Sequence, residues 1–235
     1  MKYISGGYYI VSRIMRPEYM DKDLIPEKIY SASECLCNIH PDINTLWGTS
    51  RSRKQEYVQL LDISESTYSE MEKWVEEMFE ANKFYYPQVF TTVELAKGFF
   101  SKFLNHIADA KIIGIGLPEN FIEAFLQYEK PQNKLMEEQY GIEKLLLNQT
   151  LVDEKDFRML GYEVLGYEYG TFHSYLCNGL EKDYEKHFGF TLNENCFISS
   201  LDEAIRFCDY SNDEELGTEP VLWLPWGIFE YKNLN

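Results

Sequence analysis

Residues 161–177 read Gly161-Tyr-Glu-Val-Leu-Gly-Tyr-Glu-Tyr-Gly170 and then Thr171-Phe-His-Ser-Tyr-Leu-Cys177. Both runs contain several aromatic residues, and Gly170 separates them. Two such runs on either side of a glycine are typical of strands joined by a turn. This stretch therefore predicts a pair of neighbouring strands, around which the other elements can be placed.

Working outward, other segments predict strands or helices. The expected strands cover residues 8–15, 111–117 and 221–224, the last ending at Pro225-Trp226-Gly227. The expected helices cover residues 51–61, 66–82, 92–107, 119–129, 181–188 and the segment that starts at Ser200. Helices and strands mix without regular βαβ alternation, which favours the α+β class. We expect one domain, residues 1–235, with a mixed or antiparallel sheet covered by helices and possible halves at 1–110 and 111–235.

Two helices carry more detailed signals. In 66–82, with Ser66 or Thr67 as the N-cap, apolar residues recur on one face, as in an amphipathic helix. Gly98 lies in the middle of 92–107. Glycine costs about 1 kcal/mol relative to alanine inside a helix, so its presence predicts close packing at that position.

The charge of the chain restricts its partners. The chain has 39 Asp and Glu and 22 Lys and Arg, which gives a formal charge of −17. Of its residues, 45% are hydrophobic and 16% aromatic. This apolar content can form a core, so the surplus acid belongs on a folded surface. Such a surface repels nucleic acid and anionic membranes and attracts basic partners. Residues 181–219 are the most acidic segment, with eleven acids and three bases.

The N-terminus lacks the apolar core of a signal peptide, and no apolar run approaches the length of a membrane span. The five cysteines are an odd number and do not form a secreted disulfide framework. We expect a cytoplasmic protein with reduced thiols.

Metal and phosphate sites are not expected. Cys35, Cys37 and His40 lack a fourth ligand at a recognisable spacing, so we predict no metal and no cofactor. Gly114-x-Gly116 precedes Pro118-Glu119, where the glutamate would repel an anion, and turn geometry explains the glycines better.

Catalytic groups are an alternative interpretation. His173 and Cys177 share a strand face but stand about 13 Å apart by the strand rise, although a Cys–His pair from distant segments stays open. Several carboxylates could act as acid–base pairs but are predicted to be a solvated face. These carboxylates are Glu163 with Glu168, and Asp153 with Glu154 and Asp156.

The segment after the last helix is the candidate binding site. It combines acids, which steer association with a basic partner, and aromatic residues, which supply anchors. The predicted partner-binding residues are Asp209, Tyr210, Asp213, Glu214, Glu215, Glu219, Trp223 and Trp226. A solvated loop, with both tryptophans in the core, is the alternative.

Residues 160–208 also resemble a class of known proteins. The relevant stretches are Gly161-Tyr-Glu-Val-Leu-Gly-Tyr-Glu, Phe172-His-Ser-Tyr-Leu-Cys-Asn, Asn193-Glu-Asn and Ser200-Leu-Asp-Glu-Ala. The order of residue types in these stretches resembles that of cytoplasmic immunity proteins of bacterial toxin–immunity systems. The resemblance assigns no role to individual residues. The resemblance implies a protein that neutralises a toxin domain by binding it.

The sequence therefore predicts a non-catalytic acidic protein that inhibits a protein partner, in particular a basic toxin or effector. Two alternatives stay open. One is a small hydrolase or transferase with a Cys/His/Glu site assembled from distant segments. The other is an inhibitor from a phage or mobile element that acts on a host enzyme.

Overall fold

The computed structural model describes residues 1–33, 36, 54–85, 89–133, 142–152, 155–168, 171–216 and 218–232. Within these ranges seven strands form one sheet in the order β4-β5-β1-β6-β9-β7-β8, and every pairing is antiparallel. The strands are β1 (Tyr3–Val11), β4 (Phe84–Tyr85), β5 (Val89–Phe90), β6 (Lys111–Pro118), β7 (Phe157–Glu168), β8 (Thr171–Ser174) and β9 (Trp223–Tyr231). A second, small sheet pairs β2 (Ile14–Met15) with β3 (Lys28–Ile29).

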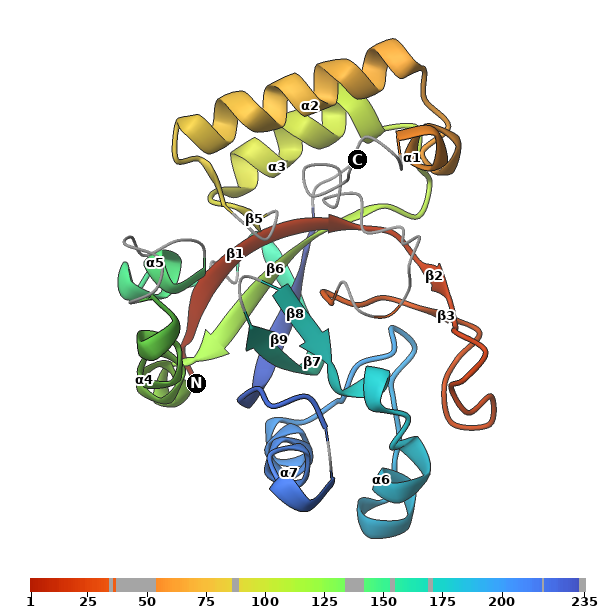
Figure 1. Ribbon diagram of the computed structural model, residues 1–235, viewed down its shortest axis with the longest axis vertical. Coiled ribbons are helices and arrows are strands. Elements are labelled where there is room, and N and C mark those ends of the chain that lie inside the picture. The colour runs from red at the N-terminus through yellow and green to blue at the C-terminus, as the bar shows by residue number, and fades with distance from the viewer. Residues whose placement is uncertain are drawn as a thin grey trace.

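Helices pack on both faces of the large sheet (Figure 1). The α-helices are α1 (Lys54–Leu60), α2 (Glu65–Glu80), α3 (Val93–Phe99), α4 (Ile122–Asn133), α5 (Ile142–Leu147), α6 (Glu181–Phe188) and α7 (Leu201–Ser211). Shorter turns are η3 (Phe100–Leu104), η4 (Glu119–Phe121), η5 (Tyr175–Asn178) and η6 (Glu214–Leu216). Helices α2 and α3 cover β1, whereas α6 and α7 lie at the opposite end of the molecule (Figure 1). The chain is a single α+β domain, as the sequence predicts.

The core consists of separate hydrophobic clusters, because side chains along the strands point alternately to the two faces of the sheet. In β6, Ile113 packs on the face that also carries Trp226 and is covered by α4 and α5, whereas Ile112 packs on the other face under α1–α3. A third cluster, which includes Val164 and Trp223, lies under α6 and α7. Successive strand side chains point to opposite faces, so β6, β7 and β9 contribute to a core on each side.

Strand β9 runs past the point where its sequence predicts an end. Pro225 is opposite Val164 of β7, while pairing with β6 covers only Gly227–Glu230. Pro225 therefore lies where β9 has one strand neighbour, and its missing N–H breaks no ladder. The prediction that Pro225 ends the strand is wrong for this reason.

The start of α2 also differs from its prediction. Ser64, not Ser66 or Thr67, is the N-cap, and its side chain accepts a hydrogen bond from Thr67 N. The apolar stripe predicted along α2 is confirmed, with Met71 and Val75 buried.

The expected close contact at Gly98 is wrong. Gly98 is exposed on α3, and a Cβ built there meets nothing within 4 Å. The predicted helix 92–107 is divided, because the α-helical turns end at Phe99 and a π-helical turn covers Phe100–Leu104.

Candidate functional site

Helix α7 presents the predicted acidic residues to solvent because its other face is buried. Ser200 caps the helix by accepting a hydrogen bond from Glu203 N at 3.2 Å, as the Ser200-x-x-Glu203 spacing indicates. Ala204, Phe207, Cys208 and Ser211 are buried against the sheet. Asp209 therefore points outward and is exposed, as are Asp213 and Glu215 beyond the end of the helix.

The segment after α7 is held in place by side-chain hydrogen bonds. The amide of Asn212 donates to Trp223 O at 3.0 Å and accepts from Trp223 N at 2.8 Å, which ties the helix end to the start of β9. Thr218 Oγ1 donates to Ser211 O at 2.9 Å, and Asp213 Oδ1 accepts from Glu215 N at 3.0 Å. These bonds fix the direction in which the acidic segment faces.

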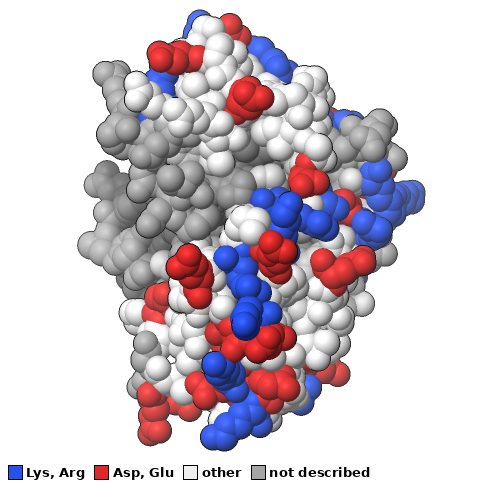
Figure 2. Space-filling model, turned by 90° about the vertical axis from the view of Figure 1, so that its right-hand side faces the viewer, with Lys and Arg blue, Asp and Glu red and all other residues white. Residues whose placement is uncertain are grey.

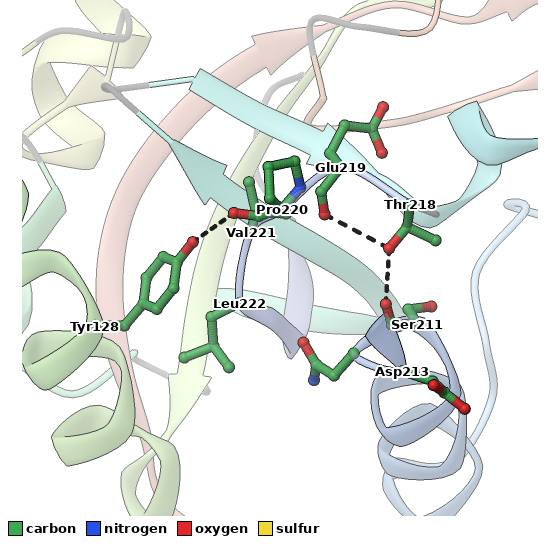
Figure 3. A pocket seen from close by; sticks show the side chains of 9 residues that line it. Tyr128, Ser211, Asp213, Thr218, Glu219, Pro220, Val221 and Leu222 are labelled. Carbon is green, nitrogen blue, oxygen red and sulfur yellow. Dashed lines mark hydrogen bonds between the residues drawn. The ribbon is translucent and has the colours of Figure 1, made fainter. Parts of the chain in front are cut away.

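A pocket of about 550 Å³ opens beside this segment (Figure 3). Its lining comes from α4, the end of α7 and the segment that leads into β9: Tyr128, Ser211, Asn212, Asp213, Thr218, Glu219, Pro220, Val221 and Leu222. No Lys or Arg is among them. The hydroxyl of Tyr128 closes one side by donating to Pro220 O at 2.8 Å.

The two carboxylates of the pocket stand at its rim. In Figure 3 the side chains of Asp213 and Glu219 point away from the centre of the lining residues. Oε2 of Glu219 is buried and has no hydrogen-bond partner within the described part of the chain. The side chains of Ser211, Asn212, Thr218 and Tyr128 already form hydrogen bonds within the protein.

An aromatic group flanks the acids on their other side. The ring of partly exposed Tyr210 lies 5.4 Å from that of His187, 5.5 Å from that of Phe188 and 5.4 Å from that of buried Tyr184. Loss of solvent contact, followed by the negative charges of Asp183 and Asp213, raises the pKa of the Tyr210 hydroxyl. The ring is therefore a neutral, partly apolar surface beside several carboxylates.

Sequence reasoning named Tyr210 but missed His187 and Phe188. Both lie in the last turn of α6, whose packing against α7 brings them to Tyr210. The only sequence signal was an aromatic pair at the end of a predicted helix. We use "acidic–aromatic surface" for Asp183, His187, Phe188, Asp209, Tyr210, Asp213 and Glu215.

The two tryptophans proposed as anchors are in the core. Trp223 and Trp226 are 0% exposed, and they belong to clusters on opposite faces of the sheet. A partner cannot reach them in this structure, so the core alternative holds for both. Glu214 begins η6, and Glu219 is partly buried at the pocket rim.

The groups considered for catalysis take other roles. Glu163, expected on a solvated face, is 2% exposed. Cys177 is disulfide-bonded, so the expectation of reduced thiols is wrong for this residue. Asp153 and Glu154 lie outside the described residues, as do Cys35, Cys37 and His40. Within the described ranges, no group of three or more His, Cys, Asp or Glu side chains could hold a metal ion.

Gly114 and Gly116 lie within β6 instead of in a turn before a helix. A Cβ at Gly116 would stand 3.0 Å from Cε2 of Phe229, and one at Gly114 would stand 3.3 Å from Cε1 of Tyr8. The glycines therefore make room for aromatic rings, and the turn interpretation is wrong.

None of the described helices combines the length and apolar character needed to cross a bilayer. Comparisons with protein-family models, with curated proteins and with solved structures found no match.

Proposed function

We propose that this chain is a non-catalytic binding protein that inhibits a basic protein partner, and that the acidic–aromatic surface with its adjoining pocket is the contact region. One observation supports this most strongly: a partly exposed tyrosine, exposed carboxylates and a pocket without Lys or Arg adjoin one another at the end of α7. Acids of this kind accelerate the encounter with a basic surface. Tyrosine is also among the residues that contribute most to binding energy at interfaces.

One other face of the molecule is less suited to a basic partner. The face in Figure 2 carries a central band of Lys and Arg interspersed with Asp and Glu. Glu230 neutralises charge locally, since it binds both Lys111 and Arg158. A basic partner would meet mixed charge there.

Tyr210 indicates which kind of basic residue the surface would bind. The face of a tyrosine ring attracts a cation by about 0.5–2 kcal/mol, and arginine uses this contact more often than lysine. The nearby carboxylates of Asp183 and Asp213 would hold the same guanidinium group by charge. We therefore expect an arginine-rich segment on the partner.

The enzyme alternative has less support. Glu163 is buried and the Cys177 thiol is consumed in a disulfide, so neither group is presented to a substrate. The predicted cytoplasmic location is also weakened, because disulfides are rare in the cytosol. The proposed binding does not depend on the compartment. A toxin-like reading frame directly upstream would favour an immunity role, and an operon of metabolic enzymes would favour catalysis.

Neutralising part of the surface tests the proposal. Replacing Asp209, Asp213 and Glu215 by Asn, Asn and Gln is expected to weaken binding of a hexa-arginine peptide about tenfold at low salt, with a smaller effect at 0.15 M salt, because exposed charges are screened. Asn at position 213 keeps the oxygen that accepts from Glu215 N. We expect an unchanged melting temperature. Isothermal titration calorimetry measures the affinity.

A matched control separates a specific surface from general attraction. Glu70, Glu76 and Glu80 are exposed on α2, and changing all three to Gln alters the net charge by the same amount. This control should keep most of the affinity for the peptide. An equal loss in both triple variants would mean that net charge alone drives binding, and the proposed surface would be rejected.

A further inference from the structure

A buried carboxylate fastens the segment after β3 to the sheet. Glu163 lies on β7 opposite Trp226 and accepts hydrogen bonds from Ser31 Oγ at 2.5 Å and Ala32 N at 2.9 Å. Ser33 continues the attachment, because its N donates to Ser31 Oγ at 2.9 Å and its Oγ donates to Phe172 O at 3.0 Å. Residues 31–33 thus attach to β7 and β8 through side chains, with Glu163 accepting two of the bonds.

No Lys or Arg among the described residues forms an ion pair with this carboxylate. The other groups that act on it are the Ser174 hydroxyl from β8, Tyr175 from η5 and Cys196 from the turn before α7. Burial raises the pKa of both Tyr175 and Cys196, so neither carries charge near neutral pH. Ionised Glu163 would therefore be a buried charge that hydrogen bonds from Ser31, Ala32 and Ser174 offset, with no ion pair to a described cation.

We propose that Glu163 is a proton-controlled latch, which holds residues 31–33 on the sheet while it is protonated and loosens them when it releases its proton to solvent. Burial raises the pKa of this carboxyl from its usual 4.5 to about 7, although hydrogen bonds from Ser31, Ala32 and Ser174 oppose the rise. A detached segment would expose the carboxyl and restore its usual pKa. Between pH 4.5 and about 7, attachment of the segment is therefore coupled to the uptake of a proton by Glu163. The attachment weakens as the pH rises through this range.

The latch would respond to pH changes close to neutrality. A carboxyl in water is ionised throughout the neutral range, whereas this one changes charge close to pH 7. Residues 28–33 also include buried Tyr30, whose ring centroid lies 5.3 Å from Cζ of Arg13 and 5.4 Å from Nζ of Lys111. Loosening of the segment would therefore change the edge of the sheet at β8 and the setting of Tyr30. The latch is separate from the acidic–aromatic surface, and its failure would leave the proposed function untouched.

Amide hydrogen exchange measured by NMR at pH 5.5 and pH 8 tests the latch in the whole protein. The amide of Ala32 donates directly to Glu163, and the amide of Ile198 donates to Tyr162 O at 2.9 Å on the same strand, β7. Protection factors remove the intrinsic effect of pH on exchange. We expect the protection of Ala32 to fall more than tenfold between the two pH values while that of Ile198 stays constant.

The Glu163→Gln variant provides the matched control. A glutamine can accept from Ala32 N and donate to Ser31 Oγ, so it imitates the protonated carboxyl at every pH. Ala32 in this variant should keep at pH 8 the protection that the wild-type protein shows at pH 5.5. If the variant does not fold, the wild-type comparison of Ala32 with Ile198 still decides. Constant protection at Ala32, or an equal fall at Ile198, would overturn the latch.

Discussion

Replacing Gly161 with alanine is expected to lower the free energy of unfolding by about 4 kcal/mol, the sum of backbone strain and overpacking. Gly161 has a φ angle of +141°, which L-residues rarely adopt, and it lies at a register shift between β7 and β9. An added Cβ would stand 2.7 Å from Ile198 O and 2.8 Å from Phe197 Cβ. Neither atom can move freely, because Ile198 is bonded through its backbone to Tyr162.

Denaturant unfolding measures this loss, and Gly179 supplies the control. Gly179 also has a positive φ, +66°, but a Cβ there meets nothing within 4 Å. Gly179→Ala should cost about 1 kcal/mol, because only the backbone preference is disturbed. Similar losses at both positions would show that Phe197 and Ile198 do not restrict the space beside Gly161.

Replacing Trp226 with alanine is expected to cost about 4 kcal/mol of stability, as other large-to-small changes in cores do. Its ring is fully buried, with edge-to-face contacts to Phe172 at 5.1 Å and Phe125 at 5.7 Å. The side chain thus joins β9 to β8 and α4, and its removal leaves a cavity between them. Thermal and denaturant unfolding measure the effect.

Trp226→Phe keeps an aromatic ring at the site and should lose clearly less stability than Trp226→Ala. A surface anchor would behave differently, since truncation would then reduce binding and leave the melting temperature unchanged. That outcome would restore the first interpretation of this residue and contradict its place in the core.

Much of the fold could be predicted because local signals agree with the final structure. Strand β6 is an apolar run that ends at Pro118, α6 ends before Gly189 with φ +69°, and α7 begins with a Ser200 cap. Each of these signals acts within a few residues. Helix α5 (Ile142–Leu147) was not predicted, because a helix of six residues is too short for a clear periodicity.

The failures arise where distant segments decide the outcome. Pro225 can stay in β9 because β6 pairs only farther along the strand, which no local pattern shows. In the sequence Glu163 is one acid among many, yet it is bound by Ser31 and Ala32, which lie 132 and 131 positions away in the chain. The same reason explains the site: the acids of 209–215 were visible in the sequence, whereas His187 and Phe188 meet Tyr210 only through the packing of α6 on α7.

The most direct test of the proposed function locates the contact on the protein. The hexa-arginine peptide is titrated into isotope-labelled protein at about 0.15 M salt, where long-range attraction is screened beyond roughly 8 Å. We expect the largest amide shift changes at residues 183–188 and 209–222, together with the Tyr128 amide. Changes that spread evenly over all acidic surfaces, or that concentrate on the exposed glutamates of α2, would contradict the proposed function.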